Sequence, residues 1–354
     1  MRRASKEVKI GNIKIGGENP IAIQSMTTTP ASDVEETVEQ INRLYEAGAD
    51  IVRFTVPDET SAKAVSLIKS KVKIPIVADI HFDHRLALEC IDGGIDKIRI
   101  NPGNIGSREK AREVARAAMA SGTPIRIGVN SGSLEKEFYE KYGSCPKAMV
   151  ESAKYHASIL EECGMENIVI SLKASNVKKT VEAYTLMAKE CNYPLHLGVT
   201  EAGTAYGGII KSSAGIGALL LDGIGDTIRV SLTADPIEEI KAAKALLSAL
   251  DLREEPELVS CPTCGRCRIN LFQIAEKVEK YLENVKKPIK VAVMGCAVNG
   301  PGEAREADFG VAGGMGKGLI FAKGEILKTV EEQYLAEEFV KTVEEYCRSL
   351  KQPR

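Results

Sequence analysis

The sequence predicts an α/β protein in which a TIM (β/α)₈ barrel is followed by a small α+β domain. Eight short runs rich in β-branched residues recur over roughly the first 250 residues, and helical patterns separate them. The glycine fingerprint that opens a helix after the first strand of a doubly wound sheet is absent. We therefore expect a barrel domain over residues 1–251 and a second domain over residues 259–354.

The strands are predicted from period-two alternation and from β-branched content. Residues 7–18 alternate around Gly11-Asn12, which predicts a hairpin that plugs one end of the barrel. The eight barrel strands are expected at residues 21–26, 51–56, 74–80, 97–101, 124–130, 167–173, 194–200 and 227–233.

The helices are predicted from apolar residues at helical spacing. The first covers residues 33–47, where Ser32 and Glu35 form a capping-box pattern and Gly48 is a stop signal. The others are expected at residues 60–71, 83–92, 107–121, 147–163, 177–190, 212–222 and 236–249.

Residues 252–258 (LREEPEL) read as a charged connector between the domains. Beyond them we expect a helix at residues 268–284 and a strand at residues 289–294. Further strands are expected at residues 308–312, 318–322 and 325–330, followed by a helix at residues 332–350.

Composition narrows the class of partner. The 354 residues carry a net charge of −2 and contain no Trp, so neither nucleic acid nor a membrane surface is an expected partner. No apolar run approaches the roughly 18 residues that a membrane-spanning helix needs. The nine cysteines are not spaced like those of a small secreted scaffold, so we expect a reducing cytoplasm.

Cations recur near the ends of the predicted strands, which is where active sites of this fold lie. They are Arg53, Arg99, Arg126, Lys173 and Arg229. A buried guanidinium needs an anionic partner, and carboxylates such as Asp79 and Glu201 are one possible source. The cations outnumber these carboxylates, which predicts a strongly anionic ligand such as a phosphate or a diphosphate. The loop Gly203–Gly208, before a helix expected near Ser212, is predicted to add N–H donors.

Neutral and acidic side chains share these strand ends. The neutral ones are His81, Asn101, Asn130 and Ser231. Glu201 ends the seventh strand among the cations and is the candidate general acid or base; its alternative role is that of a counter-ion to Arg229 or Lys173. His196 lies within a strand and is expected to be a core histidine.

Two stretches of the second domain carry thiols with metal-ligand spacing. Cys261 and Cys264 form a Cys-x-x-Cys pair, and Cys296 follows about thirty residues later. Such thiolates suit either zinc or an iron–sulfur cluster. Cys267 would complete a zinc site of four cysteines, whereas Glu303 would give a cluster one harder and more exchangeable ligand. The remaining cysteines are expected to be inert small hydrophobes.

The chain resembles the family of (E)-4-hydroxy-3-methylbut-2-enyl diphosphate synthases, which act in the methylerythritol phosphate route to isoprenoids. The resemblance covers essentially the whole length and matches the two-domain bacterial form. It rests on the motifs QSMTTTP (24–30), ADIHF (78–82), RINPGN (99–104), RIGVNSGSL (126–134), GVTEAG (198–203), SCPTCGR (260–266) and GCAVNGPGEA (295–304).

The resemblance implies a 4Fe–4S cluster, a substrate and a role for each strand-end residue. The cluster ligands would be Cys261, Cys264, Cys296 and Glu303. The substrate would be 2-C-methyl-D-erythritol 2,4-cyclodiphosphate, and its diphosphate would be held by Arg53, Arg99, Arg126 and Lys173. Further substrate contacts would come from His81, Asn101, Asn130, Ser231 and Asn299, and Glu201 would handle protons.

The implied reaction is a two-electron reductive ring opening with loss of water, fed by reduced flavodoxin or ferredoxin. The resemblance also implies a head-to-tail homodimer, in which the cluster domain of one subunit closes the barrel of the other. Cys267 is outside the shared ligand set.

Two other functions are compatible with the residues alone. One is a pterin- or phosphate-ligand transferase barrel that carries a structural zinc module, and stoichiometric zinc in a colourless protein would favour it. The other is a non-enzymatic electron carrier or iron–sulfur scaffold, whose function would survive mutation of Arg126 or Glu201.

Overall fold

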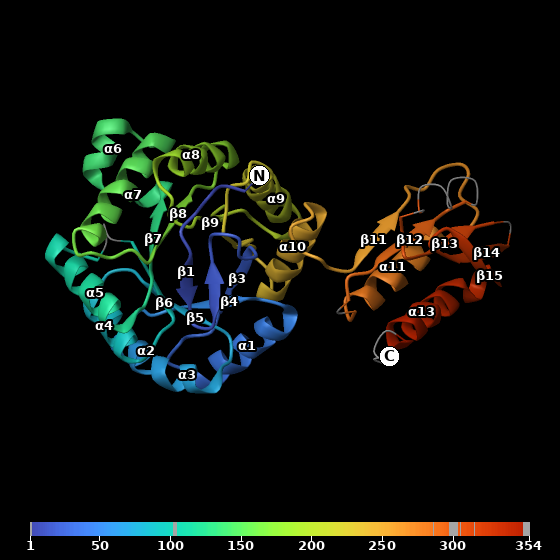
Figure 1. Ribbon diagram of the computed structural model, residues 1–354, viewed down its shortest axis with the longest axis horizontal. Coiled ribbons are helices and arrows are strands. Elements are labelled where there is room, and N and C mark those ends of the chain that lie inside the picture. Colours follow the sequence, from blue (N-terminus) through green and yellow to red (C-terminus); the bar gives the residue numbers. More distant parts are fainter. Residues whose placement is uncertain are drawn as a thin grey trace. The chain divides into compact units, whose positions relative to one another are not determined.

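The computed structural model describes residues 2–101, 105–285, 287–296, 304, 306–314 and 316–349. The chain divides into two units, Met1–Arg253 and Glu254–Arg354. Figure 1 shows the first unit in blue to yellow and the second in orange to red. No helix among the described residues is both long and apolar enough to cross a membrane.

Eight parallel strands form the barrel of the first unit. Their sheet order is β8-β7-β6-β5-β4-β3-β10-β9, and a bridge between Ile170 and Leu195 joins its two ends. The predicted (β/α)₈ barrel is therefore confirmed. The strands are β3 (Ala22–Met26), β4 (Ile51–Thr55), β5 (Ile76–Ile80), β6 (Lys97–Ile100), β7 (Ile125–Asn130), β8 (Ile168–Lys173), β9 (His196–Leu197) and β10 (Thr227–Ile228).

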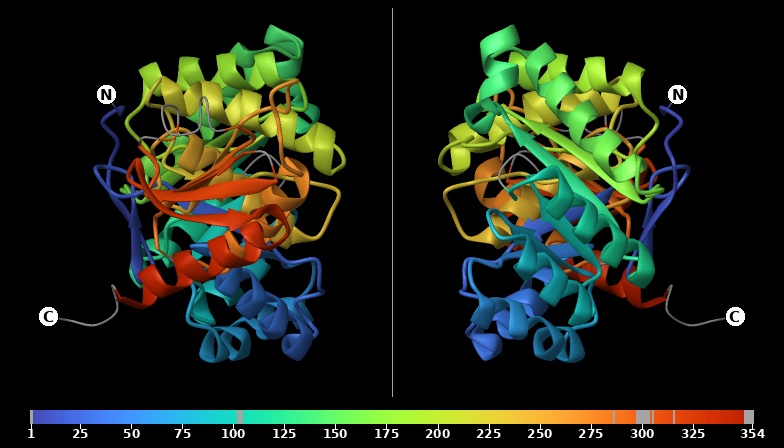
Figure 2. Two further views of the ribbon diagram at one scale, coloured as in Figure 1. Left: turned by 90° about the vertical axis from the view of Figure 1, so that its right-hand side faces the viewer. Right: turned by 90° about the vertical axis from the view of Figure 1, so that its left-hand side faces the viewer.

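The barrel helices lie outside these strands, as views from several sides show (Figures 1 and 2). They pack apolar faces against the outer sides of the strands in one continuous core. The helices are α1 (Val34–Ala47), α2 (Glu59–Lys63), α3 (Val65–Lys71), α4 (His84–Asp92), α5 (Arg108–Ser121), α6 (Lys136–Tyr142), α7 (Pro146–Glu161), α8 (Val177–Glu190), α9 (Ala205–Leu221) and α10 (Pro236–Ala249).

The starts of helices α1 and α9 correct two details of the sequence prediction. Helix α1 is capped by Asp33, whose carboxylate accepts from the Glu36 N–H at 3.1 Å, and not by Ser32. Helix α9 begins at Ala205, well before Ser212, so part of the glycine-rich segment is helical. A Cβ on Gly208 would lie 2.6 Å from Leu232 Cδ2, so a larger residue there would require the Leu232 side chain to move.

The predicted N-terminal hairpin is present as β1 (Val8–Ile10) and β2 (Ile13–Ile15). Its buried Val8, Ile10 and Ile15 pack on Ala22, Ile51, Val77 and Val169 of the barrel strands. These barrel residues lie at or near the amino ends of their strands. The hairpin is therefore an apolar plug at the barrel end opposite the expected active site.

In its described residues, the second unit is a five-stranded mixed sheet with two helices. Its strand order is β11-β12-β13-β14-β15, and the first three strands are parallel. Helices α11 and α13 share an apolar core with these strands. The elements are β11 (Glu257–Ser260), α11 (Leu271–Leu282), β12 (Lys290–Met294), β13 (Phe309–Gly313), β14 (Lys317–Ala322), β15 (Glu325–Glu331) and α13 (Glu332–Ser349).

Strand β11 corrects the prediction of a connector over residues 252–258. Glu257 to Ser260 pair with β12, from Glu257↔Lys290 to Ser260↔Val293. The pattern was missed because four residues beside a proline give little periodic signal. The strand matters for the second unit because it leads directly into Cys261.

Candidate functional site

Alternate residues of the barrel strands face inward, and near the carboxyl ends these inward residues are mostly charged. The register places Asp79 opposite Arg99, and Arg99 opposite Arg126. Lys173 ends β8 opposite Asn130. The four cations predicted to bind a diphosphate (Arg53, Arg99, Arg126 and Lys173) are each at most 8% exposed.

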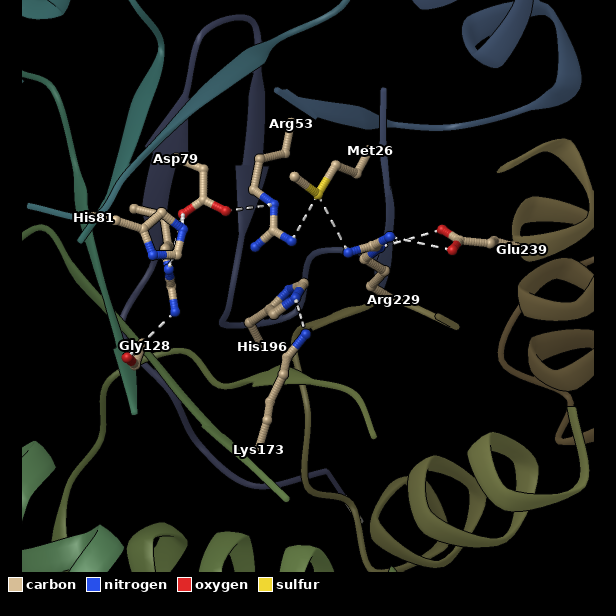
Figure 3. Close-up of polar contacts among 10 residues, drawn as sticks. Met26, Arg53, Asp79, His81, Gly128, Lys173, His196, Arg229 and Glu239 are labelled. Carbon is tan, nitrogen blue, oxygen red and sulfur yellow. Dashed lines mark hydrogen bonds and ion pairs between the residues drawn. The ribbon is translucent and has the colours of Figure 1, made fainter. Parts of the chain in front are cut away.

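Asp79 joins two of these cations and a histidine (Figure 3). Its Oδ1 accepts from Arg99 Nη1 at 2.9 Å, and its Oδ2 lies 3.4 Å from Arg53 Nε. His81 Nε2 lies 3.5 Å from Asp79 Oδ1 and 3.3 Å from Arg99 Nη1. Burial favours the neutral acid, but Arg53, His81 and Arg99 outweigh it and hold the pKa of Asp79 well below its ordinary value. Asp79 is thus a fixed negative charge that orients the two arginines.

Arg229 has a different carboxylate partner, which the sequence did not reveal. Its Nε and Nη2 donate to the two oxygens of Glu239 at 3.2 and 3.1 Å. Glu239 comes from helix α10 and is buried, and it also accepts from the Leu232 N–H at 3.0 Å. Its signal in the sequence was only that of an acid in the first turn of a helix. Met26 Sδ lies between Arg229 Nη1, at 3.4 Å, and Arg53 Nη2, at 3.0 Å (Figure 3).

Lys173 is linked to His196 instead of to a carboxylate. Its Nζ lies 3.3 Å from His196 Nε2, and His196 Nδ1 lies 2.7 Å from Thr227 Oγ1. Burial and the surrounding cations lower the pKa of Lys173 and that of His196 well below their ordinary values. A neutral His196 that accepts from Lys173 donates its Nδ1–H to Thr227. The expected core histidine is therefore a support for a predicted binding residue.

Arg126 has the least compensated charge of the predicted binding residues. It is 1% exposed, and its Nε and Nη1 have no hydrogen-bond partner among the described residues. Burial first, and then repulsion from Arg53 and Arg99, hold the pKa of Arg126 well below its ordinary value. Burial likewise lowers the pKa of Arg53 to about 10, against the attraction of Asp79. An anionic ligand would relieve both costs.

Lys97 is a further buried basic residue, and its place at the start of a strand gave no sign of this in the sequence. It is 0% exposed and lies two residues before Arg99 on β6. In this part of the described barrel, six basic side chains lie close to two carboxylates, those of Asp79 and Glu239, and only Arg53, Arg99 and Arg229 contact them. The six are Arg53, Lys97, Arg99, Arg126, Lys173 and Arg229. This surplus is the property expected of a polyanion site.

Two inward-facing glycines leave room for the cationic side chains. A Cβ on Gly128 would lie 2.5 Å from Arg99 Nε, and a Cβ on Gly198 would lie 2.8 Å from Lys173 Nζ. Both distances are too short for a real Cβ contact, so any larger residue would displace the cation. Gly128 and Gly198 are thus explained by the space that the side chains of Arg99 and Lys173 occupy.

Substitution Gly128→Ala is expected to push Arg99 away from Asp79. We expect the affinity for inorganic pyrophosphate, measured by titration calorimetry, to fall by about tenfold or more, since a charge-assisted contact contributes roughly 1.5–3 kcal/mol. The melting temperature should fall as well, because overpacking costs roughly 1–3 kcal/mol. Gly132→Ala is the control, because a Cβ there meets nothing within 4 Å. Unchanged binding in Gly128→Ala would contradict this role of the glycine.

The remaining predicted residues follow the same strands. Asn101 is buried, with Nδ2 at 3.5 Å from Ser133 Oγ, while Asn130 and Ser231 are partly exposed. Glu201 is exposed and has a φ of 52°, a left-handed conformation that is costly for a residue with a Cβ. No ion pair links Glu201 to Arg229 or Lys173 in the described part of the chain, and those two contact Glu239 and His196 instead.

Cys261 and Cys296 lie beyond the carboxyl ends of two neighbouring parallel strands of the second unit. Cys261 follows β11, and its N–H donates to Val293 O at 3.2 Å, which extends the ladder with β12. Cys296 follows β12 by two residues, and the Gly295 N–H points at Cys261 Sγ from 3.1 Å. Parallel pairing thus brings two stretches 35 residues apart to one edge of the sheet.

The donor set at this edge fits a soft metal cofactor. All eight cysteines whose side chains are described are free of disulfides, and Cys264 is exposed in the loop after β11. Hydrogen bonds from Arg266 lower the pKa of Cys264, which favours its thiolate. Within the described ranges, no three His, Cys, Asp or Glu side chains are grouped closely enough to hold a metal ion. Asn299 and Glu303, both predicted site residues, lie outside the described residues.

Cys267 has contacts of its own. Its thiol donates to Ile269 O at 3.3 Å, and a Cβ on Gly295 would lie 2.8 Å from its Sγ. The thiol thus packs directly on the Gly295 backbone.

Comparison with known proteins covers both units. The family model described as the GcpE TIM-barrel domain matches residues 5–244, and that of the GcpE protein C-terminal domain matches residues 257–345. A Caldanaerobacter subterraneus protein named 4-hydroxy-3-methylbut-2-en-1-yl diphosphate synthase (flavodoxin) is 57% identical over 98% of this chain and 99% of its own. Proteins of the same name from Clostridium perfringens and Bacillus subtilis are 58% and 55% identical, each over 97% of this chain and over 99% and 92% of their own.

Solved structures of lower identity share the barrel. Dihydropteroate synthases from Stenotrophomonas maltophilia and Yersinia pestis each superpose with a TM-score of 0.52, at 14% and 11% identity. Each match covers 70% of this chain and 100% of the other. At such identity, the likeness concerns the fold alone.

Proposed function

The chain belongs to the GcpE family, and from this premise we propose that it is a 4-hydroxy-3-methylbut-2-en-1-yl diphosphate synthase. It is an oxidoreductase of isoprenoid biosynthesis that reduces 2-C-methyl-D-erythritol 2,4-cyclodiphosphate, with ring opening and loss of water. The observation that carries the proposal is the 57–58% sequence identity to synthases of this name over nearly the whole chain. The surplus of buried cations in the barrel supports it, because a cyclic diphosphate is a compact polyanion.

The barrel residues are proposed to bind and orient the diphosphate. Arg99 is already oriented by Asp79, so its guanidinium is fixed before a ligand arrives. Arg126 brings unpartnered N–H groups, and Lys173 brings an Nζ that is supported by His196. Further substrate contacts are proposed for Arg53, His81, Asn101, Asn130, Ser231 and Asn299.

Glu201 is proposed as the proton-handling group. Loss of the substrate oxygen as water requires protons, and an exposed carboxylate at a strand end is placed to deliver them. Its left-handed backbone supports the assignment, since such conformations concentrate at functional sites.

Substitution Glu201→Gln is expected to lower kcat by about 10²–10⁴-fold with little change in substrate affinity. The amide keeps the shape of the side chain but exchanges no proton, so binding and chemistry separate. Steady-state kinetics under anaerobic conditions measures both parameters. Glu182→Gln, on the exposed face of α8, is the matched control. A normal kcat in Glu201→Gln would remove this residue from the proton transfer.

An iron–sulfur cofactor is expected in this family, and we propose a 4Fe–4S cluster held by Cys261, Cys264, Cys296 and Glu303. When bound, such a cluster supplies the electrons for the reduction. The chain contributes thiolates at one sheet edge and the Gly295 N–H to the sulfur of Cys261. The packing of Cys267 against Gly295 and Ile269 supports leaving it out of the ligand set.

The electron donor is proposed to be reduced flavodoxin or ferredoxin, and the relatives' printed name supports flavodoxin. A head-to-tail homodimer and a cytoplasmic location are proposed with the same family as support. The alternative of a phosphate-ligand transferase with structural zinc predicts a colourless protein that contains zinc and no acid-labile sulfide.

Genetic complementation tests the proposed function in a cell. We expect the gene to restore growth to a bacterial strain whose own synthase has been switched off and which has no other route to isoprenoids. A copy encoding Arg126→Met should not restore growth. Failure of the wild-type gene, with the protein produced and its cofactor present, would overturn the proposal.

A further inference from the structure

Lys97 is a charged residue type in a place where charge is costly. Its side chain is 0% exposed, and its Nζ has no hydrogen-bond partner among the described residues. Lys97 precedes Arg99 by two residues on β6, so both side chains enter the barrel, and Lys97 lies one layer deeper. An unpartnered buried amine lowers the stability of the protein, and this one lies directly beneath the basic side chains at the carboxyl ends of the barrel strands.

The surroundings of Lys97 are apolar below and cationic above. In the register it lies opposite Val77, which belongs to the apolar plug formed with the N-terminal hairpin. The groups that interact with it electrostatically are Arg53 on β4, Arg126 on β7 and the neutral His196 on β9. The nearby carboxylate, Asp79 on β5, is engaged by Arg53 and Arg99. Lys97 therefore shares Arg126's lack of a counter-charge.

These surroundings favour the neutral amine in the free protein. Burial first, and then repulsion from Arg126 and Arg53, hold the pKa of Lys97 well below its ordinary value. A pKa that folding lowers costs stability at pH values below the ordinary pKa of the amine. A polyanion held by Arg126 and Arg53 would act on Lys97 in the opposite direction and favour the ammonium form.

We propose that Lys97 is a positioning residue of the anion site, and that its amine takes up a proton from solvent when the polyanion binds. The ammonium group then repels Arg126 and Arg53, which keeps both guanidinium groups directed toward the ligand. The step balances simply, because one proton moves from water or buffer to the lone pair of Nζ and no other bond changes. Binding then strengthens as the pH falls through the range between the pKa values of the free and bound forms. The inference rests on the proposed function, since it takes the diphosphate to be the ligand.

Anaerobic titration calorimetry of the holoenzyme with inorganic pyrophosphate tests this proposal. Titrations in two buffers of different ionisation enthalpy give the number of protons taken up on binding. We compare the wild-type protein, Lys97→Met and the control Lys71→Met, whose lysine is exposed. Protonation of pyrophosphate itself is common to all three, so the difference reports Lys97.

We expect Lys97→Met to take up fewer protons than the other two proteins, by up to one per site, and to bind about tenfold more weakly. Its melting temperature should be higher, because the cost of burying the amine is gone. A purely structural lysine would give the reverse, a lower melting temperature and unchanged proton uptake. Equal uptake in wild type and Lys97→Met overturns the proposal, and so does failure of both Lys97→Met and Lys97→Gln to fold. If pyrophosphate does not bind to the wild-type protein at all, the anion site itself is wrong and the proposed function loses its support with it.

Discussion

Replacing Arg126 with methionine is expected to raise the KM for the cyclodiphosphate by more than about a hundredfold while the protein becomes no less stable. Two charge-assisted hydrogen bonds to a phosphate contribute on the order of 3 kcal/mol, and each 1.4 kcal/mol is a factor of ten. The variant is expected to be no less stable because Arg126 is buried and two of its nitrogens have no hydrogen-bond partner among the described residues. Methionine is shorter and uncharged, and removing an uncompensated buried charge is often neutral or stabilising.

The measurement is anaerobic steady-state kinetics together with thermal unfolding of the same preparations. Arg116→Met is the matched control, because Arg116 is exposed on helix α5. The two measurements together are diagnostic. Replacing an arginine needed for folding would lower the melting temperature, whereas replacing a ligand-binding arginine weakens substrate binding alone. A KM within a few-fold of wild type would mean that the diphosphate is held elsewhere.

Substitution Cys296→Ser is expected to abolish activity and to leave the second unit without most of its iron and acid-labile sulfide. Serine keeps the size of the side chain but removes the soft thiolate ligand that iron–sulfur clusters require. Visible absorbance, iron and sulfide analysis of anaerobically purified protein measure the loss. Cys163→Ser is the control, because Cys163 belongs to the barrel unit and is free.

A second variant separates holding the cluster from using it. If Glu303 is the exchangeable ligand, Glu303→Ala should keep most of the iron while losing most of the activity. Complete loss of the cluster in Glu303→Ala would show that this ligand is mainly structural. A wild-type iron content in Cys296→Ser would remove Cys296 from the ligand set.

The barrel could be predicted because its signal is local and repeated. The β-branched runs locate the strands within a few residues. Because active sites of this fold lie at the carboxyl ends of the strands, the candidate binding residues there could be chosen without a structure. The last two strands were predicted as seven residues each but pair regularly over only two, His196–Leu197 and Thr227–Ile228. Hydrophobic pattern alone does not report where regular pairing stops.

What could not be predicted depends on contacts between distant segments. Glu239 was missed because an acid in a first helical turn is ordinary, and only the fold places it against Arg229. Lys97 was missed because a lysine that opens a strand is normally exposed, whereas this one is fully buried. Strand β11 was too short to show a period, yet it aligns Cys261 with the strand that leads to Cys296. Chemistry could thus be read from residue types, but their partners could not.

The most direct test of the central claim is anaerobic turnover of the purified enzyme with 2-C-methyl-D-erythritol 2,4-cyclodiphosphate and reduced flavodoxin. Phosphorus NMR and mass spectrometry should show the cyclic diphosphate converted to a linear allylic diphosphate, with two electrons consumed for each product formed. An unchanged cyclodiphosphate in the presence of reduced donor, from a colourless protein that contains zinc, would contradict the account.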